Sequence, residues 1–273
     1  MRTPLVSWHR TLSRSVLPAA LGLLLAAAAT SEDYRAPRTA DGKPDLNGIW
    51  QALGGAHWDV EGHAARMGPV VELGALGAVP AGLGVVVGGE IPYQPWAAEK
   101  QAANLAGWLE LDPVVKCYMP GIPRATYMPF PFQILQAPDA ILMAYEFAGA
   151  SRIVYLNRPD FESPADMWMG HSRGHWDGET LVVDVTSQVP DTWLDSSGNF
   201  HSEKLRVAER YTARSPYHLL YEVSLEDPAV FTRPWKMSMP LYRRMEPGVQ
   251  LLEFKCIEFV EEMMYGHLRK KEK

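Results

Sequence analysis

Beyond residue 131, apolar and polar residues alternate in short runs that are separated by turn-forming residues. Such alternation is typical of β-strands, because successive side chains of a strand point to opposite faces of the sheet. The pattern predicts nine strands, at residues 132–136, 141–147, 152–156, 169–176, 179–186, 204–213, 218–225, 235–241 and 250–259. It also predicts a tenth strand, at residues 47–51.

Short turns rather than helical crossovers join these predicted strands, so neighbouring strands should pair antiparallel. We expect an all-β domain, an antiparallel up-and-down barrel, since closure also removes the unpaired edges of a sheet; a sandwich is the alternative. The apolar faces expected inside form four rows, which are Ile141, Met143, Tyr145 and Phe147; Leu181, Val183 and Val185; Leu219, Tyr221, Val223 and Leu225; and Trp235, Met237, Met239 and Leu241.

The chain before the barrel is rich in glycine and proline. Residues 54–92 are poor in charge and show neither helical nor strand periodicity, which predicts an irregular excursion. Within it, residues 74–92 fit a disordered insertion, which the composition favours, or an apolar flap over a pocket. One short helix is expected near residues 95–108, because Pro95 suits a first helical turn and good helix formers follow it.

The first 29 residues have the composition of a secretory signal peptide. Arginines without acidic residues precede an apolar run at 16–29, which is shorter than the roughly 18 residues of a membrane-spanning helix. Ala27 and Ala29 form an A-x-A cleavage site before Thr30. An uncleaved anchor is the alternative. We expect an exported protein, periplasmic or extracellular, with no membrane span after cleavage.

These patterns divide the chain into four segments. The expected segments are a signal peptide at 1–29, an irregular segment with one helix, packed on the barrel, at 30–130, an antiparallel β-barrel at 131–260 and a polar tail at 261–273.

Charge and cysteine content narrow the class of protein further. The formal net charge is −6 and most basic residues are scattered along the chain, which argues against a nucleic-acid partner. The chain has two cysteines, Cys117 and Cys256. An even number in an oxidising compartment favours a disulfide between them, and two separately buried thiols are the alternative.

Three stretches of the mature chain carry a family resemblance. They are DGKPDLNGIWQ, PFQILQAPDAILMAYE and GHSRGHWDGETLVVDVTSQVPDTWLDSSGNFHSEKLRVAERY. Together they resemble a family of secreted bacterial proteins of unknown function, and this resemblance implies no catalytic residues. Separately, Gly48-Ile49-Trp50 resembles the G-x-W opening of lipocalin-type barrels, and Gly174-His175-Trp176 repeats it. The second resemblance implies a calycin-like barrel that holds one lipophilic ligand.

Candidate catalytic residues concentrate in the hairpin around Asp177-Gly178. An Asp-Gly pair between two strands favours a two-residue type I′ turn, which fixes the register of the hairpin. On that register His171 lies opposite Asp184, on one face with Arg173 and His175. A carboxylate beside a histidine orients the ring and raises its basicity, as general-base catalysis requires. The alternative is a solvated face of an amphipathic hairpin.

Two further regions hold candidate groups. The long connection at residues 188–203 combines Trp193 with acidic residues and His201, which fits either a functional lid or a solvated loop. Glu209 shares a strand face with apolar residues, so we expect it to be buried. It is then either paired with a cation, for which Arg173 is the candidate, or held with a raised pKa for acid catalysis.

Metal and cofactor chemistry has little support in the sequence. His171 and His175 would stand about 13 Å apart along a strand, too far to share an ion. The chain contains neither a G-x-S-x-G elbow nor a glycine-rich phosphate loop with its lysine. We therefore expect no metal and no cofactor.

Two functions fit these features. The first is a proton-transfer enzyme (hydrolysis, dehydration, isomerisation or cyclisation) for a small, largely apolar molecule, with His171 as base and Asp184 orienting it. Arg173 or His201 would be its acid or electrophilic partner, and Glu209 a further acid. The second is a binding protein for a lipophilic ligand. The residues expected to contact the small molecule are Trp193, Tyr145, Tyr211, Trp235 and Met237. The sequence leaves substrate and oligomeric state open.

Overall fold

The computed structural model describes residues 34–68, 71–254, 256, 263–264 and 266–268. They belong to one compact unit, residues 33–273. The expected signal peptide and most of the expected polar tail lie outside the described residues.

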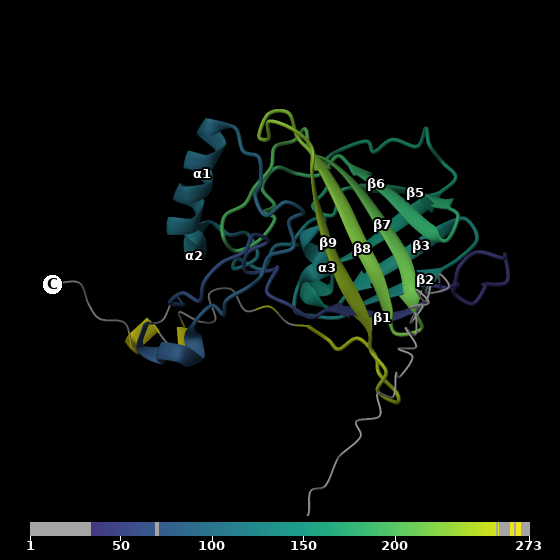
Figure 1. Ribbon diagram of the computed structural model, residues 1–273, viewed down its shortest axis with the longest axis horizontal. Helices are drawn as coiled ribbons and strands as arrows, with labels where there is room; N and C mark the ends of the chain where they lie inside the picture. The colour runs from purple at the N-terminus through teal and green to yellow at the C-terminus, as the bar shows by residue number, and fades with distance from the viewer. Residues whose placement is uncertain (1–33, 69–70, 255, 257–262, 265, 269–273) are drawn as a thin grey trace, which may run out of the picture. The chain divides into compact units, whose positions relative to one another are not determined.

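Nine strands close into one barrel and follow each other around it in chain order (Figure 1). They are β1 Gly48–Ala52, β2 Phe132–Gln136, β3 Ala140–Tyr145, β4 Ser151–Leu156, β5 His171–Asp177, β6 Thr180–Thr186, β7 Arg206–Ser215, β8 His218–Glu226 and β9 Trp235–Arg243. The expected mainly β barrel is confirmed. The four predicted apolar rows are buried, so the inward faces of these strands were also assigned correctly.

The strand predicted at residues 250–259 does not form in the described part of that range, residues 250–254 and 256. β1 closes the ring on β9 instead, with Trp50 paired to Arg243. The segment after β9 is held by other contacts. The Leu252 amide donates to the Glu146 carboxylate at 2.8 Å, and the Phe254 ring lies 4.8 Å from that of Phe147. Phe254 therefore serves aromatic packing rather than a β-ladder, and Leu252 is exposed.

One pair of neighbouring strands is parallel. β4 and β5 pair parallel, whereas the other pairs around the ring are antiparallel. A closed ring with an odd number of strands requires this, because strict alternation would leave the first and last strands running in the same direction. The barrel is therefore mixed rather than up-and-down throughout. The exception lies at residues 157–170, where a long connection replaces the expected short turn.

The expected helix forms as two pieces, α1 Pro95–Ala106 and α2 Trp108–Leu111. Gly107 separates them, and its amide donates to the carbonyls of Ala103 and Asn104 at the end of α1. The remaining helical elements are α3 Arg124–Tyr127 and the 3-10 turns η1 Val71–Gly77, η2 Phe147–Gly149 and η3 Gly266–Leu268. None of the helices in the described part of the chain combines the length and apolar character needed to cross a membrane.

Residues 85–87 of the glycine-rich segment lie along β9, and Val79 and Gly82 pair with Arg66 and His63, so the favoured interpretation of a disordered insertion is wrong for these residues. The Val87 amide donates to the Lys236 carbonyl at 2.8 Å, and the Ser238 amide donates to the Val85 carbonyl at 3.0 Å. β1 pairs only with the end of β9, at residues 241–243. Residues 85–87 thus hydrogen-bond to backbone groups of β9 that do not pair with β1. These bonds protect a strand edge that would otherwise be open.

Cys117 and Cys256 form a disulfide with their Cα atoms 5.6 Å apart, which confirms the expected bridge. It ties the chain after α2 to the segment that follows β9.

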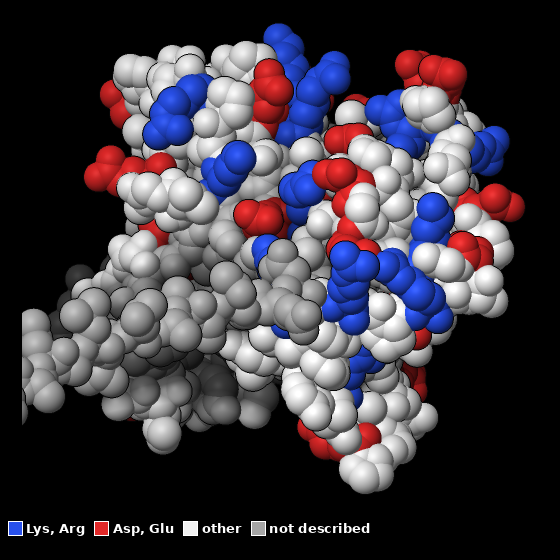
Figure 2. Space-filling view, turned by 45° about the vertical axis from the view of Figure 1, so that its right-hand side comes forward, with Lys and Arg blue, Asp and Glu red and all other residues white. Residues whose placement is uncertain are grey.

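Charged side chains of both signs are interspersed on the face shown in Figure 2. Surface ion pairs join Arg38 to Glu179 and Arg210 to Asp177. A mixed surface of this kind produces no broad positive field on that face. The expectation that nucleic acid is not a partner remains a prediction.

Candidate functional site in the barrel interior

A buried ion pair lies inside the barrel. Arg152 extends inward from β4 on the same face as Val154, and Glu209 extends inward from β7 on the same face as Val207. The guanidinium donates from Nη1 to Oε2 at 2.6 Å and from Nη2 to Oε1 at 3.1 Å. The two side chains are 2% and 0% exposed. This bidentate geometry is the one in which arginine binds a carboxylate most strongly.

Three tyrosine hydroxyls surround the pair. Tyr211 and Tyr221 each donate to Glu209 Oε1 at 2.8 Å. Arg152 donates from Nε to the Tyr145 hydroxyl and from Nη2 to the Tyr211 hydroxyl, both at 3.0 Å. Glu209 therefore accepts four hydrogen bonds, and the charges of the pair cancel within a polar cluster enclosed by the apolar core.

The polar cluster contains more strong donors than strong acceptors. Met143 Sδ lies 3.2 Å from Arg152 Nη2 and 3.6 Å from the Tyr145 hydroxyl, although a thioether is a weak acceptor. The Ser172 hydroxyl accepts from Arg152 Nη1 at 3.3 Å and has no acceptor for its own hydrogen within the described residues. A ligand oxygen placed near Met143 Sδ would therefore meet two donors that are already oriented toward it.

Burial fixes the protonation of the donors in the cluster. It raises the pKa of Tyr211 and of Tyr221 well above the ordinary value, and the adjacent Glu209 carboxylate adds to the effect. Burial alone would lower the pKa of Arg152, but Glu209 and neighbouring tyrosines outweigh it and the pKa rises. Arg152 and both tyrosines therefore keep their protons at neutral pH, which suits hydrogen-bond donation rather than proton exchange.

The expected burial of Glu209 is confirmed, whereas the expected partner, Arg173, is wrong. Arg173 lies on the outer face of the barrel, where its guanidinium donates to the Pro159 carbonyl. The partner is Arg152, which sequence reasoning missed. A signal was present, because Arg152 alternates with Ile153 in a predicted strand and so shares the inward face of Val154.

The β5–β6 turn differs from the predicted one. Asp177 pairs with Thr180, so the two turn residues are Gly178 and Glu179. Gly178 has a φ of 59°, and Glu179 is not among the residues with positive φ. This pattern fits a type II′ turn, whose first central residue is glycine, rather than the predicted type I′ turn. The ladder extends one residue further than expected.

The changed turn moves every pairing in the hairpin. His171 pairs with Thr186, and Asp184 pairs with Arg173, so the predicted pairing of His171 with Asp184 is wrong. The side chains of His171 and Asp184 still share one face of the sheet. Asp184 is directly opposite Arg173, and Arg173 stands two residues from His171 along β5, so all three point to the same side. That face is the outside of the barrel, because Asp184 is exposed whereas its neighbour along β6, Val183, points to the opposite face and is buried.

His171 is buried on this outer face by the connection that leads into β5. Its ring lies 5.1 Å from the Phe161 ring and 5.6 Å from the Tyr155 ring. Its Nε2 lies 2.7 Å from the Phe161 carbonyl oxygen, to which it donates. In this position His171 anchors residues 157–170 to the barrel.

His201 is a buried hydrogen-bond acceptor. Its Nδ1 donates to the Ser202 carbonyl at 2.9 Å, so its Nε2 accepts from the Thr192 hydroxyl at 2.7 Å and from Gln188 Nε2 at 3.1 Å. Burial lowers the pKa of His201, which keeps the ring neutral. The arrangement stabilises residues 188–203, and residues 192–201 are buried rather than forming a solvated loop.

Asp195 connects that loop to the N-terminal segment. Its carboxylate accepts from the Val60 amide at 2.8 Å, the Ser197 amide at 2.9 Å and Asn199 Nδ2 at 2.6 Å. A second buried ion pair lies in the same region, where Arg124 binds Asp112 at 2.7 Å through each of two nitrogens. These contacts order residues that composition alone marked as irregular.

Asp195 and His57 have pKa values shifted in opposite directions. Burial raises the pKa of Asp195 from 3.8 to about 7, and the Asp59 carboxylate adds to this. Burial and the Arg124 charge lower the pKa of His57 from 6.5 to about 4. The His57 ring Nδ1 is also buried without a hydrogen-bond partner. Between pH values of about 4 and 7, the folded state therefore favours the neutral form of both groups.

Replacing Asp195 and replacing His57 should change the pH dependence of the free energy of unfolding in opposite directions. The raised pKa of Asp195 stabilises the folded state below pH 3.8, and this stabilisation is lost as the pH rises to about 7. The free energy of unfolding of Asp195→Asn should therefore increase relative to that of the wild type as the pH rises. The lowered pKa of His57 stabilises the folded state above pH 6.5, and this stabilisation is lost as the pH falls to about 4. The free energy of unfolding of His57→Gln should therefore increase relative to that of the wild type as the pH falls. Urea unfolding across this range should show a difference from the wild type that changes by about 4 kcal/mol for Asp195→Asn and by about 3 kcal/mol for His57→Gln. Curves parallel to the wild type would contradict both assignments.

The residues expected to contact a small molecule occupy different places. Tyr145 and Tyr211 belong to the polar cluster. Trp235 and Met237 are buried on β9, and Trp193 is buried in the 188–203 loop. The five candidate catalytic residues do not converge either, since only Glu209 lies in the barrel interior. Tyr221 and Arg152 complete the interior cluster that the sequence did not assemble.

No group of three or more His, Cys, Asp or Glu side chains in the described residues is arranged to hold a metal ion. The expectation that purified protein contains no stoichiometric zinc remains a prediction.

Comparison of the chain with family models, curated proteins and solved structures found no match. The resemblance to secreted bacterial proteins therefore remains an expectation, and function has to be argued from the geometry of the site.

Proposed function

We propose that the barrel binds a small lipophilic molecule through an acceptor oxygen, such as that of a ketone or an ester. The observation that carries this proposal is the convergence of Arg152 Nη2 and the Tyr145 hydroxyl on Met143 Sδ. Both donors are strong, and an oxygen at that position would be a better acceptor than the thioether. The methionine thus holds the place of the ligand oxygen.

The energetics of the cluster support a recognition role. Apolar residues in place of a buried ion pair are often neutral or stabilising, so the pair contributes little to the fold that hydrophobic packing could not. Arg152 and Glu209 do, however, fix the positions of Tyr145 and Tyr211 through hydrogen bonds. A ligand gains affinity from donors that are held in place before it binds.

The surroundings of the cluster suit an apolar ligand. Met143, Met237 and Met239 are buried in the core together with Trp235. Methionine is unbranched and adapts its side-chain conformation easily, so a shift of Met143 provides room next to the donors. Lipophilic contact would supply most of the affinity, and the two donors would select the oxygen.

We favour binding over proton transfer for this site. Glu209 is the one carboxylate of the cluster, and its oxygens already accept four hydrogen bonds. A substrate proton would have to displace one of these donors. The place of action that we propose is outside the cytoplasm, which the Cys117–Cys256 disulfide supports because such bonds persist in oxidising compartments.

Two isosteric probes test the selection of an oxygen. Acetophenone and α-methylstyrene differ by a carbonyl oxygen in place of a methylene group. We expect calorimetric titration to give the ketone about tenfold higher affinity, because it gains hydrogen bonds inside an apolar site. Tyr145→Phe removes one of the two donors, so it should reduce this preference and leave binding of α-methylstyrene unchanged.

Tyr217→Phe is the matched control, since Tyr217 is 59% exposed and lies outside the cluster. It should preserve the preference for the ketone. Equal affinity of the wild type for both probes would refute recognition of an oxygen, and absence of saturable binding of either would refute the binding module. Mass analysis of molecules that co-purify with the exported protein would identify the natural ligand.

A further inference from the structure

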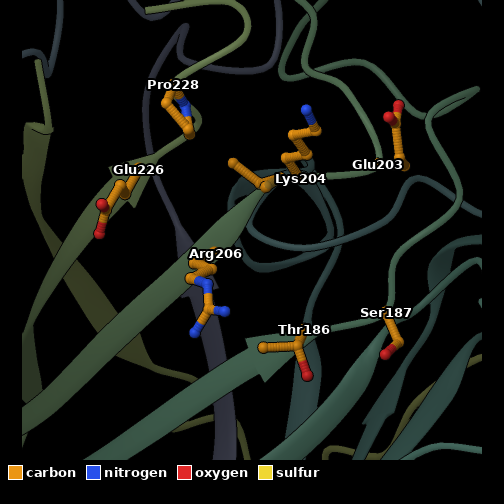
Figure 3. A pocket seen from close by; sticks show the side chains of 8 residues that line it. Thr186, Ser187, Glu203, Lys204, Arg206, Glu226 and Pro228 are labelled. Carbon is orange, nitrogen blue, oxygen red and sulfur yellow. The ribbon is translucent and has the colours of Figure 1, made fainter.

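A pocket of about 320 Å³ lies on the outer surface where three neighbouring strands end or begin (Figure 3). It shares no lining residue with the polar cluster of the barrel interior. Its lining comes from the end of β6, the start of β7 with the residues before it, and the end of β8. The lining residues are Thr186, Ser187, Glu203, Lys204, Leu205, Arg206, Glu226 and Pro228. This volume is within the range of small-molecule sites.

Asp227 holds two walls of the pocket in place. Its carboxylate accepts from the Ser202 amide at 2.6 Å and the Ser202 hydroxyl at 2.9 Å, just before the wall formed by Glu203 and Lys204. It also accepts from the Ala229 amide at 3.1 Å, just after Pro228. Asp227 is 1% exposed. The pocket is therefore shaped by buried contacts rather than by its own side chains.

The charged side chains of the pocket are not neutralised by each other. Arg206 lies directly opposite Glu226 in the β7–β8 ladder, yet neither forms an ion pair within the described residues. The same holds for Glu203 and Lys204, whose side chains lie along the segment entering β7 (Figure 3). The hydroxyls of Thr186 and Ser187 add two uncharged partners.

We propose that this pocket binds a small zwitterion of the α-amino acid class. A simple anion would meet the carboxylates of Glu203 and Glu226, and a simple cation would meet the charges of Lys204 and Arg206, so each would face repulsion. A molecule with one carboxylate and one ammonium group can satisfy both kinds of partner. Arg206 would bind the carboxylate, and Glu226 on the next strand would bind the ammonium group.

The remaining lining indicates room for a side chain on that ligand. Leu205 and Pro228 provide apolar surface beside the charged residues. The volume exceeds what the charged groups of an amino acid alone would fill. L-Phenylalanine is therefore a suitable probe, with 3-phenylpropionate and 2-phenylethylamine as analogues that each lack one of its charges.

Calorimetric titration of the folded chain with these three compounds tests the proposal. We expect L-phenylalanine to bind at least about tenfold more tightly than either analogue, because each analogue leaves one charged partner unsatisfied. Arg206→Gln and Glu226→Gln should each weaken binding of L-phenylalanine by about tenfold. Both positions are exposed, so these substitutions should leave folding intact.

The matched controls are Arg210→Gln and Glu222→Gln, which lie opposite each other on the same two strands but outside the pocket. They should bind L-phenylalanine like the wild type. Equal binding of 3-phenylpropionate would mean an anion site and overturn the proposal. Failure of L-phenylalanine to saturate the protein by about 10 mM, or binding that survives Arg206→Gln, would overturn it as well.

Discussion

Replacing Glu209 by glutamine is expected to lower the free energy of unfolding by about 3 to 5 kcal/mol. The amide cannot balance the charge of Arg152, whose side chain is 2% exposed and so cannot reach water. The amide nitrogen would also place a donor among the hydroxyls of Tyr211 and Tyr221, which need an acceptor. Urea unfolding monitored by tryptophan fluorescence measures the loss.

The control for this prediction is Glu222→Gln on β8, which should change stability by less than about 0.5 kcal/mol because it lies on the outer face of the barrel. A double variant, Arg152→Met with Glu209→Leu, should cost less than the sum of the two single substitutions, since it removes both charges together. Additive losses would show that the two side chains are not coupled, and the interior cluster would lose its central interaction.

Removing the disulfide is expected to cost about 5 kcal/mol in the chain-entropy model. The bridge joins Cys117 and Cys256 across a sequence separation of 139 residues, so it excludes a large share of the conformations of the unfolded chain. The double variant Cys117→Ala with Cys256→Ala should therefore unfold at much lower urea concentration than the wild type.

Reductant provides the control for the disulfide prediction. It should shift the wild type to the unfolding midpoint of the double variant and leave the double variant unchanged. Thiol titration of the denatured, unreduced wild type should find no free thiol. A double variant as stable as the wild type would mean that the bridge constrains segments already held by other contacts, such as the packing of Phe254 on Phe147.

Alternation of apolar and polar residues predicted the barrel well, because strand faces depend on local sequence alone. It failed at residues 250–254, which form no ladder and where Phe254 packs on the rings of Phe130 and Phe147. It also could not predict the parallel pair of β4 and β5. The odd number of strands in the closed ring requires a parallel pair, and the long connection at residues 157–170 places it between these two strands. Closure is a property of the whole sheet, and no single segment encodes it.

The candidate site was harder to predict than the fold. Burial of Glu209 followed from its strand face, but its partner depended on which strands lie across the interior, and Arg152 is on β4 while Glu209 is on β7. The pairing of His171 with Asp184 depended on the turn, and a shift of one residue in the turn moved Asp184 to Arg173. Errors of this size leave a strand prediction correct and change every cross-strand neighbour.

Closure of the ring through the first and last strands also affects when the fold can form. During synthesis β1 emerges early, but Trp50 must wait for Arg243 of β9 before the barrel can close. Cys117 likewise waits for Cys256. The β5–β6 and β7–β8 hairpins, which tight turns join, can assemble locally, whereas both long-range closures carry the entropic cost of bringing distant residues together. Until β9 has been synthesised, β1 and β8 expose open strand edges of the kind that make partly synthesised barrels prone to aggregation, so the barrel is protected from aggregation only once its last strand is available.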